Sequence, residues 1–162
     1  DYRMAIKKRK FNHRRKTPKE KLSGAVGKLR NELWQIRIDE TREPIKLVWE
    51  YMPPRQIRGN SRAHWTIRHK FTKMFKESAY MRLMEIDPEP MDKIRIKYIA
   101  YYAGKPVDED NLTFGMKPAL DALTEYGLIK DDSPEYVKGI EVEYHRVPHK
   151  HQIEMIMEIT EA

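Results

Sequence analysis

Apolar and polar residues alternate in four stretches of the chain, and a period of two is typical of a strand with one buried face. The predicted strands cover residues 45–51, 93–100, 137–147 and 153–160. The short linker 148–151, which carries Pro148, His149 and His151, lies between the last two. We therefore expect these two strands to pair as a hairpin.

Three other stretches repeat apolar residues at helical spacing. The longest is 66–84, where every fourth residue forms an apolar stripe that we assign to the core and not to a cofactor slot: Ile67, Phe71, Phe75, Ala79 and Leu83. A second helix is predicted over 118–126, ending at Gly127. A third, amphipathic helix extends to about residue 37 and opens with Thr17-Pro18-Lys19-Glu20, which is typical of a helix start.

The predicted elements of residues 45–162 follow the order β-α-β-α-β-β. This order favours an α/β (α+β) fold, with a small mixed β-sheet packed with two main helices. Residues 1–44 are predicted to form an extension, made of a basic arm and the amphipathic helix.

All the excess positive charge belongs to the arm. The 162 residues carry a net charge of +7, while residues 1–21 alone hold ten Lys and Arg against two acidic residues. Basic runs are typical of nucleic-acid tails, and a solubilising or localisation tail, or an arm that docks on an acidic partner, are the alternatives. The candidate DNA contacts in the arm are Lys7, Lys8, Arg9, Lys10, Arg14 and Arg15.

Several classes of protein are disfavoured by composition. The chain has no cysteine, which excludes a disulfide scaffold, thiolate zinc sites and a cysteine nucleophile. No apolar run approaches the roughly 20 residues that span a bilayer, so we expect no membrane association and a cytoplasmic location. No Gly-rich phosphate loop or dinucleotide fingerprint is present, so no nucleotide cofactor is expected.

The densest group of acidic residues is Asp108-Glu109-Asp110, followed about twenty residues later by Asp131-Asp132. If the first group is extended, Asp108 and Asp110 point to the same side, and the return segment is just long enough to bring Asp132 beside them. Clustered carboxylates repel one another unless a cation lies between them, and oxygen ligands suit Mg²⁺ or Mn²⁺. The alternative is two solvated acidic turns, one of which caps a helix.

Two further features leave alternatives open. Trp65 can stack on an unpaired base or pack in the core at the start of the long helix, and we favour the core. His145, His149 and His151 suggest a metal site by spacing, but a turn with solvated histidines is the simpler interpretation.

Taken together, these segments resemble the RusA family of Holliday junction resolvases, which is largely of phage and prophage origin. The matching motifs are D-E-D-N-L at 108–112, K-P-A-L-D-A-L at 117–123 and G-L-I-K-D-D-S at 127–133. Upstream, M-P-P at 52–54 and G-N-S-R-A-H-W at 59–65 resemble one branch of that family. The resemblance covers residues 45–161 and leaves the N-terminal extension outside.

The resemblance implies that Asp108, Asp110 and Asp132 are catalytic, Mg²⁺-binding carboxylates, with Mn²⁺ as a substitute. It implies that Lys117 assists catalysis near the scissile phosphate and that Asp131 is a supporting acid. The spacing from Asp110 to Lys117 is about three residues longer than in the most compact members. We therefore expect Lys117 at the entrance of the second helix and not within it.

The same resemblance implies a homodimer, since two symmetric sites suit paired cuts in branched, four-way-junction DNA. The candidate DNA contacts of the domain are Arg55, Arg58, Asn60, Arg62, His64, Arg68 and Lys70. The expected function is thus a Mg²⁺-dependent, structure-specific endonuclease of DNA recombination and repair. The alternatives are a non-catalytic nucleic-acid-binding protein on the same fold, and a structural module that docks on an acidic partner through residues 1–37.

Overall fold

The computed structural model describes residues 43–162, a four-stranded mixed sheet with two main helices. This α+β architecture confirms the predicted fold class. The predicted arm and the amphipathic helix lie outside the described residues. The elements are β1 (Ile45–Trp49), η2 (Arg55–Ile57), α3 (Trp65–Ile86), β2 (Ile94–Tyr102), α4 (Glu109–Tyr126), β3 (Val137–Arg146), η3 (Lys150–Gln152) and β4 (Glu154–Glu161).

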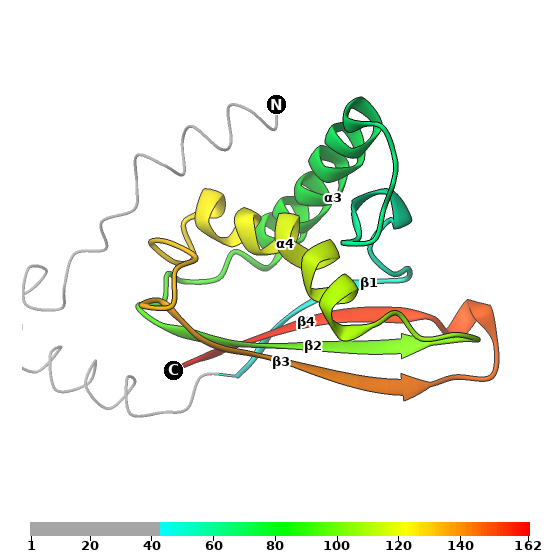
Figure 1. Ribbon diagram of the computed structural model, residues 1–162. Coiled ribbons are helices and arrows are strands. Elements are labelled where there is room, and N and C mark those ends of the chain that lie inside the picture. The colour runs from blue at the N-terminus through cyan, green and yellow to red at the C-terminus, as the bar shows by residue number, and fades with distance from the viewer. Residues whose placement is uncertain (1–42) are drawn as a thin grey trace, which may run out of the picture.

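The strands lie in the order β1-β4-β2-β3, as Figure 1 shows. β4 is antiparallel to both β1 and β2, whereas β3 is parallel to β2. The predicted hairpin of the last two strands is therefore wrong, because β2 lies between them. The burial of the strands fits this order: β2 and β4 each bury three consecutive residues, so both of their faces are covered, whereas β1 buries only alternate residues and β3 is largely exposed. Alternation identifies a strand but does not identify its neighbour.

Helix α3 confirms most of the predicted core stripe. Phe75, Ala79 and Leu83 are buried and Phe71 is partly buried, but Ile67 is 46% exposed. A repeat of four residues turns a helix by about 400°, so each step drifts by about 40°. Over the four steps from Leu83 back to Ile67 the drift reaches about 160°, which places Ile67 on the opposite side of the helix.

Helix α4 begins at Glu109, nine residues before the predicted start. The prediction took Pro118 for a first-turn proline, but the helix contains it in its interior. Proline has no N–H, so the carbonyl of Phe114 loses its usual helical donor at that point. The apolar face compensates for this loss, because Leu112 and Met116 before the proline are fully buried. Lys117 consequently lies within the helix, and the prediction that it stands at the entrance is wrong.

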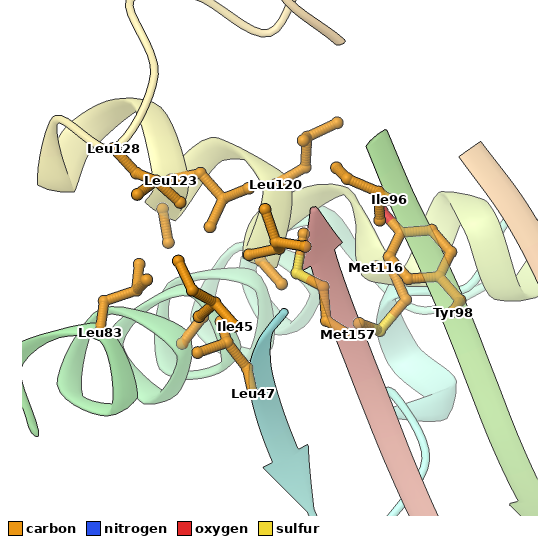
Figure 2. Packing of buried hydrophobic residues seen from close by; sticks show 14 of the residues in the cluster. Ile45, Leu47, Leu83, Ile96, Tyr98, Met116, Leu120, Leu123, Leu128 and Met157 are labelled. Atoms are coloured by element: carbon orange, nitrogen blue, oxygen red, sulfur yellow. The ribbon is translucent and has the colours of Figure 1, made fainter. Parts of the chain in front are cut away.

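The core lies between the sheet and the two helices. Figure 2 shows side chains of β1, β2 and β4 meeting those of α3 and α4, among them Leu47, Met157 and Leu120. Trp49 connects β1 to α3: its indole N–H donates to Ser78 Oγ at 2.9 Å, and its ring lies 5.2 Å from that of Phe75. Among residues 43–162, no helix is long and apolar enough to cross a membrane.

The two faces of β1 give a test of this packing. Leu47 is fully buried and its neighbour Val48 is 39% exposed on the other face. We expect Leu47→Ala to lower the free energy of unfolding by about 2–5 kcal/mol, because it removes apolar contacts and leaves a cavity. Val48→Ala is the matched control and should change it by only about 0.5 kcal/mol. Urea unfolding followed by circular dichroism measures both, and equal losses would contradict the assignment of faces.

Candidate active site

The acidic group Asp108-Glu109-Asp110 forms the start of α4. Asp108 is the N-cap residue, and its side chain makes no capping hydrogen bond. Asp110 lies in the first turn, so the predicted extended geometry of this group is wrong. A neighbouring strand holds the turn in place, because Tyr144 of β3 donates its hydroxyl to the carbonyl of Val107 at 2.7 Å. Partial burial, and then the charges of Glu109 and Asp108, raise the pKa of Tyr144.

One polar face of α4 carries two of the predicted catalytic residues, Asp110 and Lys117, together with Asp121. Asp110, Lys117 and Asp121 are spaced by seven and then four residues, and at about 100° per residue they fall within about 40° of one another around the helix. Lys117 lies about two turns, or roughly 10 Å, further along the axis than Asp110. The opposite face, with Leu112 and Leu123, is fully buried against the core.

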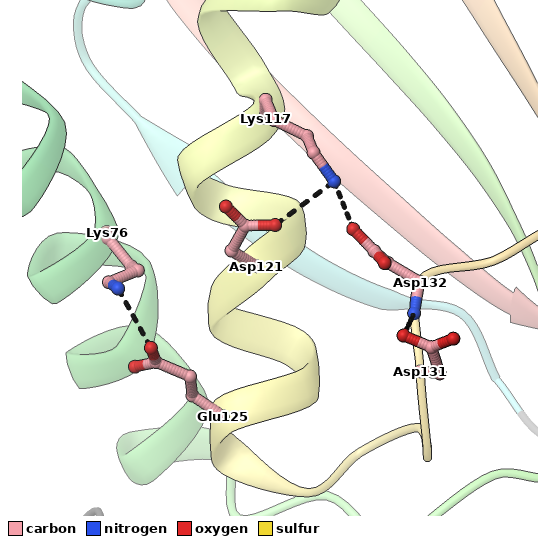
Figure 3. Close-up of polar contacts among 6 residues, drawn as sticks. All are labelled: Lys76, Lys117, Asp121, Glu125, Asp131 and Asp132. Carbon is pink, nitrogen blue, oxygen red and sulfur yellow. Dashed lines mark hydrogen bonds and ion pairs between the residues drawn. The ribbon is translucent and has the colours of Figure 1, made fainter.

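Figure 3 shows that Lys117 contacts two carboxylates. Its ammonium lies 3.1 Å from Asp121 Oδ1 and also donates to Asp132 Oδ2. Partial burial lowers the pKa of Lys117, but the bonds to Asp132 and Asp121 outweigh it and raise the pKa above its usual value. The same Lys117 bond holds the pKa of Asp132 below its usual value. Asp131 accepts the backbone N–H of Asp132 at 2.9 Å, which fixes the turn and directs its own carboxylate to the backbone.

The path of the chain after α4 explains where Asp132 lies. Gly127 ends the helix with φ at 91°, in the left-handed region, and its N–H bonds back to Leu123 and Thr124. Leu128 and Ile129 are then buried, which ties the return segment to the core. The prediction that this segment brings Asp132 beside Asp108 and Asp110 is wrong. The segment reaches the middle of the helix, beside Lys117, and not the N-terminus.

The residues expected to bind a metal fit it in part. Asp108 and Asp110 are exposed carboxylates at one helix end, a donor set that suits a hard divalent cation. Asp132 is instead bonded to Lys117. Within residues 43–162, no three or more Asp, Glu, His or Cys side chains gather closely enough to hold a metal ion. Asp108 and Asp110 are therefore the residues best placed to hold Mg²⁺, and Asp132 would have to exchange its partner.

A cavity of about 780 Å³ lies beside the start of α4. Its lining joins the loop that follows β1 to the turn that precedes α4. The loop contributes Arg55, Gln56, Arg58, Asn60, Ser61 and Arg62, and the turn and helix contribute Lys105, Pro106, Val107, Asp108 and Asn111. Four of the predicted DNA contacts thus share one cavity with one of the predicted catalytic carboxylates.

Arg58 of this cavity is held by a hydrogen bond to the backbone. Its Nε donates to the carbonyl of Pro53 at 3.0 Å. Burial, and then the nearby charge of Arg55, lower the pKa of Arg58. A guanidinium remains charged at neutral pH, so the fold holds two like charges close together. An anion in the cavity would relieve this repulsion and would accept several N–H donors.

Two glycines let the loop approach α4 closely. A Cβ at Gly59 would lie 3.0 Å from Asn111 Oδ1, and one at Gly115 would lie 3.0 Å from Pro53 Cβ. The added length between Asp110 and Lys117 contains Gly115 and therefore forms part of the contact with the loop. Ile57, buried in η2, anchors the same loop from within.

The other predicted DNA contacts lie apart from the cavity lining. His64 caps α3, accepting the N–H of Thr66 on its Nδ1 at 3.3 Å, while Arg68 and Lys70 lie on α3 itself. Trp65 is 72% exposed and tilts against His64, with ring centroids 5.7 Å apart. The prediction that Trp65 packs in the core is therefore wrong. The six predicted contacts of the basic arm lie outside the described residues.

The sequence interpretation missed two residues of this site. Lys105, assigned only to a turn, lines the cavity, and its place three residues before Asp108 was the available signal. Asp121 stood in a matching motif without a role. Its spacing of four from Lys117 predicts contact only on a continuous helix, and the late predicted start of α4 concealed that pairing.

The three histidines considered for a metal site are all exposed: His145 lies in β3, and His149 and His151 lie in the segment between β3 and β4. His145 Nε2 lies 2.8 Å from Glu143 Oε2, and the ring of His145 stacks on Tyr101. These contacts involve neither of the other two histidines. The rings of His149 and His151 stack on each other, with centroids 5.3 Å apart.

No family model matches the chain, and no match was found among curated proteins.

The Lys117–Asp132 pair predicts a modest dependence of stability on pH. Because the pKa of Asp132 is lowered on folding, its contribution is present above the unfolded value of 3.8 and is lost as pH falls through the lower folded value. We expect Asp132→Asn to cost no more than about 1 kcal/mol at pH 7, because solvent screens the half-exposed Lys117. The difference from the unsubstituted protein should shrink toward pH 3.

Urea unfolding at pH 7 and pH 3 measures this effect. Asp92→Asn, an exposed change in the loop before β2, is the matched control and should show no such convergence. A destabilisation by Asp132→Asn that stays the same at both pH values would contradict the pairing.

Proposed function

We propose that this protein is a Mg²⁺-dependent, structure-specific DNA endonuclease that resolves four-way junctions by paired phosphodiester hydrolysis, as the resemblance to RusA resolvases implies. The observation that carries the proposal is the cavity in which Arg55, Arg58 and Arg62 face Lys105 and Asp108. It combines cations that bind a phosphate backbone with a carboxylate of the kind that binds a catalytic metal.

The residues have separate roles in this proposal. Arg55, Arg58 and Lys105 bind backbone phosphates, which fixes the strand without reading its sequence. Asp108 and Asp110 hold the metal, and Mn²⁺ is the expected substitute. When bound, such an ion supplies a hydroxide nucleophile at neutral pH and stabilises charge on the phosphoryl oxygens.

Lys117 neutralises charge at the phosphate. An ammonium group has three N–H donors, and Asp121 and Asp132 accept two of them. The third donor is left for a phosphoryl oxygen. Asp121 thereby becomes a positioning residue for Lys117, and Asp131 supports the turn that carries Asp132.

Two exposed aromatic rings support binding to branched DNA. Trp65 and Phe114 are both more than half exposed, and Phe114 Cβ lies 3.5 Å from the position of a Cβ at Gly59. Bases at a junction or a single-stranded end present free faces on which such rings stack. A protein that bound only intact duplex would gain little from them.

A non-catalytic nucleic-acid-binding protein is the second candidate. The observation that favours it is the occupation of Asp132 by Lys117, which leaves the three expected metal ligands apart. The exposed carboxylates favour the enzyme, because Asp108 and Asp110 repel DNA phosphates unless a cation screens them. We further propose a homodimer as the working form and the cytoplasm of a bacterium or phage-infected cell as its location.

The first test is the loss of a single metal ligand. We expect Asp110→Asn to abolish Mg²⁺-dependent cutting of a synthetic four-way junction, because an amide is a weaker ligand for Mg²⁺ than a carboxylate. Junction binding should remain intact, because Asp110 is not one of the residues assigned to the phosphates. Cleavage is measured on denaturing gels and binding by fluorescence anisotropy. Glu109→Gln, its exposed neighbour in the same helical turn, is the matched control and should still cut.

Full cutting by Asp110→Asn would overturn the assignment of Asp110. Binding of the junction by the unsubstituted protein without cutting in Mg²⁺ or Mn²⁺ would select the non-catalytic candidate.

The second test addresses the cavity. We expect Lys105→Gln to weaken junction binding and to reduce the slope of log affinity against log salt by about one, because one phosphate contact is lost. Lys138→Gln, on the exposed edge of β3, is the matched control and should leave the slope unchanged. Equal slopes for the two variants, measured by anisotropy over a salt series, would remove Lys105 from the interface.

A further inference from the structure

A row of apolar side chains follows the side of α3 that faces away from the core. Ile67, Met74 and Met81 are each about half exposed and are spaced by seven residues. Seven residues turn a helix by about 700°, only 20° short of two turns, so the three side chains form a nearly straight line about 21 Å long. Scattered apolar residues are normal on a surface, but a line at this period is typical of a helix that packs against another helix.

The charges beside this row divide the helix into two halves. Lys70 and Lys73 are exposed in the N-terminal half and Glu85 is exposed in the C-terminal half, while Glu77 near the middle is partly buried. Other charged residues of α3 are used inside the molecule: Lys76 pairs with Glu125 at 2.8 Å, and Arg82 donates to the carbonyls of Val48 and Ser78. The exposed face of α3 therefore changes from positive to negative along its length.

Such a face is complementary to itself when two copies run antiparallel. A two-fold axis between residues 77 and 78 would place Met74 against Met81 of the second copy, and Lys70 against Glu85 of the second copy. Parallel copies would instead place like charges together. We propose that α3 pairs with α3 of a second copy in this antiparallel manner, with Met74 and Met81 at the centre of the contact and Ile67 at each end of it, opposite the segment that follows α3 of the second copy.

The arrangement deepens the proposed function and rests on its homodimer, although not on its metal chemistry. The loop that lines the cavity leads directly into the N-terminus of α3, so antiparallel helices carry the two cavities at opposite ends. A helix of 22 residues is about 33 Å long, which sets the scale of their separation. Two cation-lined cavities would then face two strands related by the same two-fold axis.

The row is short, so the association is expected to be weak and concentration-dependent. Sedimentation of the full chain over a concentration series, without DNA and without metal, measures it. We expect a monomer–dimer equilibrium that Met74→Lys and Met81→Lys each weaken at least about tenfold, because a charge replaces an apolar contact. Ile86→Lys is the matched control: it is as exposed and on the same helix, but lies about 120° away from Met74 and should not weaken the dimer.

A charge exchange tests the orientation. Glu85→Lys and Lys70→Glu should each weaken the dimer, since each places like charges together, and the double variant should restore it. Circular dichroism of each variant serves as the control for folding. A monomer at every concentration up to about 1 mM, a dimer unaffected by Met74→Lys and Met81→Lys, or a double variant that fails to recover would overturn the proposal. Failure of junction cutting with the dimer intact would count against the proposed function alone.

Discussion

The site depends on one constraint: α4 connects two neighbouring strands, β2 and β3, that are parallel. A connection from β2 to the parallel strand β3 has to cross the sheet, and a helix packed on its face is the usual solution. The apolar side of α4 fixes the helix against the core through residues such as Leu112 and Leu123. Its 18 residues then decide where the crossing starts, at Asp108, and where it ends, at Gly127. The polar side necessarily faces outward, toward the loop after β1 and the segment that returns from the helix.

Along this outward side, charges of opposite sign are separated into two places. At the start of α4, Asp108 adjoins a cavity lined by four cations, whereas in the middle of the helix the single cation Lys117 meets two carboxylates. Each place has the reverse charge balance of the other, and about two helical turns separate them. A net charge near neutrality for the domain therefore conceals a strong local pattern. A strand lying along α4 would meet the cavity cations together with Asp108 at the start of the helix, and Lys117 about two turns further along.

Much of the fold could be predicted from the sequence because its signals are local. The alternation in residues 93–100 and the buried Phe75 and Leu83 depend only on period, and both predictions are confirmed. The order of strands and the start of α4 could not be predicted in the same way, because each depends on distant contacts. Pro118 is a strong local signal for a helix start, and it is overridden because the preceding turns of the helix pack on the core through Leu112 and Met116. The same holds for the site. The cationic residues of the loop after β1 could be identified from the sequence, but their proximity to Lys105 in one cavity depends on the fold.

The pairing of Lys117 with Asp132 is compatible with the proposed role of Asp132 as a metal ligand. A carboxylate whose pKa is lowered by an ammonium is already ionised well below neutral pH, so no proton has to leave before it meets a cation. The cost of separating the pair is small because solvent reaches both groups, with 52% of the Lys117 side chain exposed. Asp121 reduces that cost further, since Lys117 retains one carboxylate partner when Asp132 changes its own. The pair therefore keeps Asp132 charged and close to α4 while leaving it free to exchange partners, and the same ammonium remains beside any phosphate that lies along this side of the helix.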